Sequence, residues 1–275
     1  MRRLAAHPDP SSWSDPPDVP EPVQGAQSVA RAMALLKQFT DAHPTWRLSD
    51  LARAEGLHRA TAYRLLTALE REGVLTRDIA RDHYRLGPEA IALGARALRA
   101  NDVRAVSHDE LSILVDATHE TATVETLVGP DMLIIDEVPG RGLVSPKPSV
   151  GTRWPAHATS TGKAVLATMG AAAVERALGP KLARFTERTI VTHAELARDL
   201  ADIRRRGWAI AAHELEIGYV AVGAVLRGQS GHAVGAISVG GSSARLTTTR
   251  LQAFGRQCKA SAARISAALG WRGAA

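Results

Sequence analysis

The first hundred residues carry a helical spacing of apolar positions, interrupted by glycine and proline. We predict a first helix from Ser28, taken as its N-cap, to a stop at Pro44, and a second, short helix from Ser49 to Gly56. The predicted inward residues of these two helices are Val29, Met33, Leu36, Phe39, Leu51 and Ala52. A third helix lies within "GLHRATAYRLLTALEREGVL", residues 56–75, and runs to about Glu72.

This third helix has two chemically different faces. Apolar residues recur at i, i+3, i+4 and i+7, so we expect a buried stripe of Ala62, Leu65, Leu66 and Leu69. The residues left facing outward are Arg59, Ala60, Tyr63, Arg64 and Thr67. An amphipathic helix alone is usually an ordinary solvated surface helix, so the flanking segments decide how to interpret this one.

Beyond Gly73 the period of the pattern changes from helix to strand. Residues 74–77 and 83–86 read as two short strands joined by a tip at 78–82, which is a hairpin. Gly87 ends the hairpin, and Pro88 suits the first turn of a further helix at residues 89–100. We expect this helix to connect two domains.

The spacing Ala52-x3-Gly56-x5-Ala62-x2-Leu65 is that of a helix–turn–helix, and the following hairpin makes it a winged helix. A recognition helix meets base edges with its first turns, so Arg59, Tyr63 and Arg64 are predicted to read DNA. Thr61 is predicted to cap the helix or touch phosphate, and Thr67 shares the outward face. On the wing, the predicted contacts to the DNA backbone or minor groove are Arg77, Arg81 and Arg85. A protein-interaction module of the same shape remains an alternative.

The second half of the chain alternates helices and strands. Helices are predicted near residues 109–118, 161–168, 171–178, 194–206 and 247–269, and strands near 123–128, 133–138, 208–212, 220–226 and 233–239. A Gly- and Pro-rich loop separates them at 139–155. This mixed order of helices and strands, which indicates antiparallel strand pairing, predicts an α+β fold.

Composition and charge narrow the class of protein. The 275 residues are 45% apolar and 23% charged, as in globular proteins, and the single cysteine fits a reducing compartment. The longest uncharged apolar stretch, residues 164–174, is shorter than the ~20 residues of a membrane span, so we expect no membrane partner and a cytoplasmic protein. Residues 24–100 carry 12 Lys or Arg against 8 Asp or Glu, a net charge of +4 that suits a polyanionic partner.

Several segments resemble known chemical motifs but lack residues that those motifs require. "HATSTGKA" has His157 where a P-loop needs glycine, and Ala164 where it needs Ser or Thr. The histidines lack metal-ligand spacing, and Cys258 lies in the final helix, where we expect it to be packed. We therefore predict no cofactor, no metal and no catalytic residues. An enzyme tethered to DNA by its winged helix is the remaining rival.

Taken in order, six segments resemble the IclR family of bacterial transcriptional regulators. They are "QSVARAMALLKQF", "LSDLARAEGLHRATAYRLLTALEREGVL", "HYRLGPEAIALG", "WPAHATSTGKAVLA", "GWAIAAHELEIGYVAVGAVL" and "GAISVGGSSARL". The resemblance covers about residues 25–270. It implies a GAF-like effector-binding domain, a homodimer or homotetramer, pseudo-palindromic operators on double-stranded DNA, and small organic acids or aromatic metabolites as effectors.

The resemblance also implies a set of effector-binding residues. Carried over to this sequence, they are Leu143, Trp154, Ser160, Thr161, Tyr219, Ala221, Ser238 and Ser243. The chain departs from the family at Ala221, where several members have cysteine, at Ala211, where they have aspartate, and at Gly240, where a serine can occur. These losses imply a less polar site and a larger, apolar or aromatic ligand. The amides at the start of the helix near 160–162 still suit a ligand carboxylate.

The predicted organisation has four parts. Residues 1–23 form a Pro-rich disordered tail, 24–87 the winged helix–turn–helix domain, 88–101 a linker helix, and 102–275 the effector-binding and oligomerisation domain. The predicted function is a ligand-responsive transcriptional regulator. We favour a repressor of a catabolic or metabolic operon, with an activator of the same architecture as the alternative.

Overall fold

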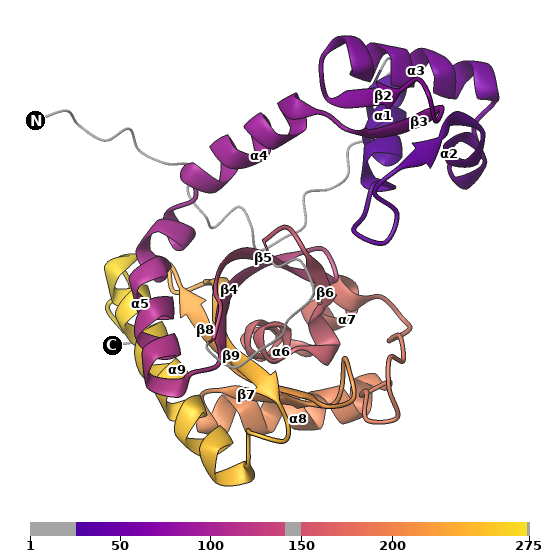
Figure 1. Cartoon of the computed structure of the whole chain (residues 1–275). Coiled ribbons are helices and arrows are strands. Elements are labelled where there is room, and N and C mark those ends of the chain that lie inside the picture. The colour runs from indigo at the N-terminus through magenta and orange to yellow at the C-terminus, as the bar shows by residue number, and fades with distance from the viewer. Residues whose placement is uncertain (1–25, 141–149, 274–275) are drawn as a thin grey trace, which may run out of the picture. The chain divides into compact units, whose positions relative to one another are not determined.

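The computed structural model describes residues 26–140 and 150–273. These residues divide into two compact units, one extending to Ala100 and the other beginning at Asn101 (Figure 1). Each unit has its own core and is described by itself. The tail predicted at 1–23 and the predicted effector residue Leu143 lie outside the described residues.

The N-terminal unit contains four helices and a small sheet within its described residues. In chain order they are α1 (Gln27–Lys37), β1 (Trp46–Arg47), α2 (Leu48–Ala54), α3 (Arg59–Arg71), β2 (Leu75–Asp78), β3 (His83–Leu86) and α4 (Pro88–Arg99). The strands form an antiparallel sheet in the order β1-β3-β2. Its core is built from Leu35, Leu48, Leu51, Ala52, Ala62, Leu66, Leu75 and Tyr84.

The predicted start of the first helix was wrong, and its predicted inward face was right only in part. Helix α1 begins at Gln27, and Ser28 is not its N-cap. Val29 and Met33 are 66% and 47% exposed, whereas Leu35 is fully buried. Leu36 and Phe39 pack against the core as predicted. Residues 26–31 are all exposed, so only the carboxyl-terminal half of α1 packs on the core.

The C-terminal unit is a six-stranded antiparallel sheet with helices, which confirms the predicted α+β fold. Its elements are α5 (Asp102–Thr118), β4 (Thr121–Val128), β5 (Asp131–Val138), β6 (Arg153–Pro155), η2 (Ala156–Ala158), α6 (Ser160–Leu166), α7 (Ala171–Leu178), α8 (His193–Arg206), β7 (Ala209–Ala212), β8 (Tyr219–Arg227), β9 (Ala233–Ser242) and α9 (Thr248–Ala268). The strand order is β6-β5-β4-β9-β8-β7. Figure 1 shows α5 and α9 along the outside of the curled sheet and α6 within the curl.

Two elements of this unit differ most from the sequence-based boundaries. Helix α5 begins seven residues earlier than predicted, because the side chain of Asn101 accepts a hydrogen bond from the Arg104 amide at 2.9 Å and caps it. Strand β6 lies within the predicted loop at 139–155 and pairs with β5. A three-residue strand is too short to show an alternating pattern.

The two faces of the large sheet differ in polarity. Val124 lies opposite Asp136, whose carboxylate contacts Arg104 and His108 of α5, so this side of the sheet faces α5 and α9. The other side faces α6, because a side chain at Gly223 would meet Ser160 and Thr161 at 3.1 Å. Strand residues alternate between the faces. The α6 side of the three central strands therefore carries Thr121, Thr123, Glu125, Ser238, Gly240, Ala221 and Gly223.

Candidate functional site

Helix α3 is held by a tight turn after α2. Gly56 adopts a positive φ of 61°, and the Leu57 amide donates to the Ala52 carbonyl at 2.8 Å. Along α3, Ala62 and Leu66 are fully buried, and Leu65 and Leu69 pack against the same core. The predicted buried stripe is confirmed, so the opposite face of α3 points away from the core of its unit.

The outward face of α3 carries the predicted DNA-reading residues. Arg59 and Arg64 are exposed, and Tyr63 is 48% exposed. Thr61 and Thr67 are half-buried at the edges of this face. Helix α3 begins at Arg59, with His58 as its N-cap, so Arg59, Tyr63 and Arg64 lie in its first two turns. These are the turns that a recognition helix presents to base edges.

The hairpin divides the three predicted wing arginines into two groups. Arg81 and Arg85 are exposed. Arg77 instead donates to the Asp82 carboxylate at 2.6 Å and lies over the Tyr84 ring, 5.4 Å from its centroid. This pairing holds the pKa of Asp82 below its usual range, and Arg59 and Arg47 add to the effect. Arg77 is therefore engaged within the wing, and the free cations there are Arg81 and Arg85.

Arg47 belongs to the same charged surface, although the sequence did not single it out. It is exposed on β1 and pairs with His83 of the wing strand β3. Its influence on the Asp82 carboxyl shows that it lies near the wing. The only sequence signal was a cation next to Trp46, because a strand of two residues has no pattern of its own.

A polar cluster lies on the α6 side of the large sheet. Glu125 is 5% exposed, and its two carboxylate oxygens accept hydrogen bonds from Thr161 at 2.7 Å and from Thr123 at 2.8 Å. The Thr123 hydroxyl also lies 2.8 Å from that of Ser238. Burial raises the pKa of the Glu125 carboxyl, and the two hydroxyl donors offset only part of this rise. Predicted effector residues Thr161 and Ser238 are thus joined through an acid that the sequence did not single out.

Tyr219 stands on the same side of the sheet. A side chain at Gly240 would meet the Tyr219 hydroxyl oxygen at 2.2 Å, so the ring extends over the glycine of β9. Burial raises the pKa of Tyr219, and the carboxyl of Glu125 adds most to this among nearby charges. The ring is nevertheless 40% exposed. Ala221, which pairs with Gly240, is buried beside it.

Comparison with known families decides the class of protein. Residues 95–267 match the family described as bacterial transcriptional regulator IclR C-terminal, and residues 28–78 match the IclR helix-turn-helix domain.

The chain belongs to the IclR family of bacterial transcriptional regulators.

Individual relatives span nearly the whole chain. It is 29% identical to the transcriptional repressor IclR of Escherichia coli strain K12 over 247 residues, which cover 89% of this chain and 90% of that protein. The IclR-type regulator of Alicyclobacillus acidocaldarius has a similar structure, with a TM-score of 0.79, 29% identity, and coverage of 88% and 98%. An IclR homologue from Microbacterium hydrocarbonoxydans, solved with 4-hydroxybenzoate, has a TM-score of 0.73, 24% identity and the same coverage. IclR proteins are regulators rather than enzymes, and so is this one.

The structure does not bring all predicted effector residues of this IclR-type chain together. In the sheet register, Trp154 of β6 lies opposite Met132 of β5. Met132 in turn lies opposite Leu127, near the carboxyl end of β4. Tyr219 pairs with Ser242, beyond the amino end of β4, and Ser243 follows the end of β9. The register thus places Trp154 at the opposite end of the sheet from Tyr219. Thr161 and Ser238 belong to the Glu125 cluster, and Ser160 lies near Gly223, the residue that pairs with Ser238.

The IclR-type segment "HATSTGKA" uses its polar groups internally. The Lys163 ammonium is buried and contacts the carboxylates of Glu214 and Asp199, each at 2.7 Å. The Thr159 hydroxyl accepts from the Gly162 amide at 3.2 Å, so one of the amides expected to meet a ligand carboxylate is already satisfied. Within residues 26–140 and 150–273, His, Cys, Asp and Glu side chains nowhere gather in a group of three that could hold a metal ion. Among the described helices, none combines the length and apolar character of a bilayer span.

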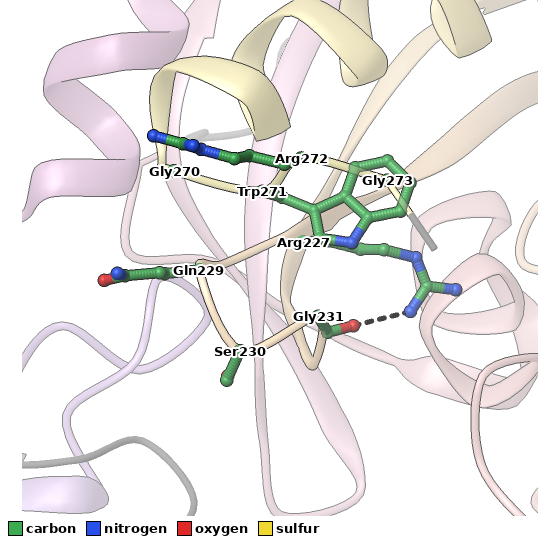
Figure 2. Close-up of a pocket in the computed structure, with 8 residues that line it drawn as sticks. All are labelled: Arg227, Gln229, Ser230, Gly231, Gly270, Trp271, Arg272 and Gly273. Atoms are coloured by element: carbon green, nitrogen blue, oxygen red, sulfur yellow. Dashed lines mark hydrogen bonds between the residues drawn. The ribbon is translucent and has the colours of Figure 1, made fainter. Parts of the chain in front are cut away.

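A surface hollow of about 900 Å³ lies where α9 ends beside the turn between β8 and β9. It is lined by Arg227, Gln229, Ser230, Gly231, Gly270, Trp271, Arg272 and Gly273. Figure 2 shows the Arg227 guanidinium pointing at the Gly231 carbonyl, to which it donates at 2.7 Å. None of the predicted effector residues lines this hollow, so it is separate from the Glu125 cluster.

Proposed function

We propose that this IclR-family regulator is a repressor of a catabolic or metabolic operon whose affinity for its operator is changed by a small organic acid, aromatic in character. Its DNA contacts come from α3 and the wing, and its effector contacts from the α6 side of the large sheet. Two copies of the winged helix occupy a pseudo-palindromic operator as part of a dimer or tetramer. The cellular compartment of such a regulator is the cytoplasm.

The exposed face of α3 is the observation that supports DNA reading most directly. Arg59, Tyr63 and Arg64 are exposed, whereas Ala62 and Leu66 on the inward side of the same helix are fully buried. Exposed arginines on the first turns of a recognition helix bind guanine edges or phosphates. Arg47, Arg81 and Arg85 extend the same positive surface and suit the sugar–phosphate backbone.

The effector proposal rests on the polar groups that the sheet and α6 share. Thr161 of α6 and Ser238 of β9 are linked through Glu125 and Thr123 of β4. The homologue from Microbacterium hydrocarbonoxydans, which has the same fold, holds 4-hydroxybenzoate. An aromatic acid is the ligand class that we propose for this chain, and the residues at 88–101 are proposed to carry its effect to the DNA-binding unit.

The repressor assignment follows the relatives. The Escherichia coli relative is a transcriptional repressor, and so is the Klebsiella pneumoniae protein AllR. A repressor bound at its operator must leave when the effector accumulates, so the effector is expected to weaken DNA binding.

A salt-dependent gel shift on the DNA upstream of the gene tests the proposal. The logarithm of the affinity should fall linearly with the logarithm of salt concentration, by about 0.9 per neutralised phosphate. Arg64→Ala should weaken binding at least about fivefold, since a base-contacting arginine contributes about 1–3 kcal/mol. Arg176→Ala removes the same charge from an exposed position on α7 and serves as the control. Equal binding by native protein and Arg64→Ala, with Arg176→Ala also unchanged, would refute the assignment of Arg64.

A further inference from the structure

The Glu125 carboxyl is chemically unusual for its position. It lies on a sheet face covered by α6 and is 5% exposed, yet its partners are two neutral hydroxyls, those of Thr161 and Thr123. Removing a carboxyl from water is costly unless charged or multiple donors compensate it. Burial accordingly raises the pKa of Glu125. An acid kept in place at this cost calls for a role beyond linking β4 to α6.

The carboxyl has unused hydrogen-bonding capacity. Its two oxygens offer about four lone-pair positions. Thr161 occupies one on Oε2, and Thr123 occupies one on Oε1. Thr123 also has an alternative partner in the Ser238 hydroxyl, 2.8 Å away. Glu125 can therefore accept a further hydrogen bond from a ligand without leaving either threonine unpartnered.

Tyr219 lies on the same side of the sheet as the Glu125 cluster. The residue is 40% exposed, whereas burial raises the pKa of its hydroxyl. Its hydroxyl lies against Gly240, which pairs with Thr121, two residues before Thr123 on the same strand face. Tyr219 and the Glu125 cluster thus share one face of β4, β9 and β8.

The contacts of Glu125 favour a hydrogen-bond donor over an anion, because both of its oxygens already accept from hydroxyls. After burial, the causes that raise the pKa of Tyr219 are the carboxyls of Glu125, Glu137, Glu120 and Glu216, in that order. Glu120 is held by Arg245 in a two-point contact at 2.6 and 2.8 Å, which balances its charge. A ligand carboxylate placed beside Glu125 would face an acid at close range, whereas a ligand hydroxyl would find an acceptor.

We propose that Glu125 is the specificity-determining residue of the effector site and that, with Tyr219, it selects an aromatic ligand carrying a neutral hydroxyl at this end. Any carboxylate of the ligand points away from Glu125. The inference rests on the proposed effector function and adds to it the chemical group that the protein reads. It differs from the sequence-based expectation of a less polar site, which stays a prediction, because β4 brings a buried acid to the sheet face on which Ala211 lies.

A series of benzoates that differ only at the position opposite the carboxylate tests this directly. The probes are 4-hydroxybenzoate, benzoate, 4-aminobenzoate and benzene-1,4-dicarboxylate, and calorimetry measures their affinity for the full chain. We expect native protein to bind the hydroxyl compound at least about tenfold more tightly than benzoate, and the dicarboxylate most weakly. Glu125→Leu should bring the ratio of the first two affinities to within about twofold.

The controls separate specificity from folding. Glu175→Leu makes the same exchange at an exposed position on α7 and should keep the native ratio. If Glu125→Leu does not fold, Thr123→Val removes only the hydroxyl that holds Oε1 and should reduce the ratio at least about threefold. A purely structural Glu125 would lower the melting temperature of its variant without changing the ratio.

Three outcomes overturn the proposal. The first is an unchanged affinity ratio in the folded Glu125 or Thr123 variant. The second is that native protein binds the amino or the dicarboxylate compound more tightly than the hydroxyl compound. The third is that native protein binds none of the probes. The operator gel shift, run on the same preparations without ligand, distinguishes these results from failure of the proposed function. Native protein that binds its operator but none of the probes refutes the ligand class alone, whereas native protein that does not bind the operator refutes the regulator assignment.

Discussion

The thiol of Cys258 illustrates how burial alone sets the chemistry of a residue in this molecule. Cys258 lies on α9 with none of its surface exposed, and its sulfur is 4.0 Å from the Val222 carbonyl of β8. Burial raises the pKa of the thiol to about 12. At pH 8 the thiolate is then on the order of one part in ten thousand, against roughly a quarter for an ordinary cysteine. The expectation that Cys258 is packed is confirmed.

Native protein should therefore resist thiol reagents. We expect Ellman's reagent at pH 8 to leave Cys258 unmodified in the folded chain and to titrate one thiol per chain after unfolding in guanidinium, since the chain has a single cysteine. Absorbance of the released thiolate measures both states. Rapid release of one equivalent from folded protein would show that α9 does not cover Cys258 as described.

At the residue scale, sequence patterns located buried stripes better than buried polar groups. Ala62 and Leu66 followed from helical spacing and are fully buried. Glu125 did not follow, although Thr121, Thr123 and Glu125 alternate with apolar residues along β4. Such alternation normally indicates a face in water. Only the packing of α6 on that face, which is a long-range contact, turns Glu125 into a buried acid.

Element boundaries followed from local chemistry where a strong local signal existed. Pro88 begins α4 as expected, and Gly207 ends α8 with a positive φ of 83°. The short strands β1 and β6 escaped prediction because each is defined by its pairing partner rather than by its own sequence.

Two helical glycines provide a matched test of how the elements pack. A side chain at Gly255 of α9 would meet the Trp208 ring at 2.3 Å, while one at Gly94 of α4 would meet nothing within 4 Å. Overpacking costs about 1–3 kcal/mol, and alanine gains up to about 1 kcal/mol over glycine in a helix. We expect Gly255→Ala to lower, and Gly94→Ala to raise, the melting temperature of its own unit in calorimetry. A stabilised Gly255→Ala would mean that α9 stands farther from Trp208 than described.

At the scale of the whole molecule, the chain combines two units that differ in the chemistry of their functional surfaces. One presents exposed arginines on a small winged helix, and the other surrounds a buried acid with hydroxyls on a six-stranded sheet. The chain order of these parts could be read from sequence, because helix–turn–helix spacing and strand–helix alternation are local patterns. The oligomeric state could not be predicted from periodicity, since it depends on surfaces.

Symmetric pairing makes a geometric prediction about the operator. If two copies of α3 enter successive major grooves, the half-site centres lie about one helical turn, or 10–10.5 base pairs, apart. Inserting about 5 base pairs between half-sites turns one groove to the opposite side of the duplex and should reduce affinity to that of a single half-site. Inserting about 10 base pairs returns both major grooves to the same side of the duplex and should recover binding in part. Footprinting the upstream DNA defines the half-sites, and gel shifts measure the series. Equal affinity at every spacing would mean that each winged helix binds on its own, and the symmetric assembly would then have no part in recognising DNA.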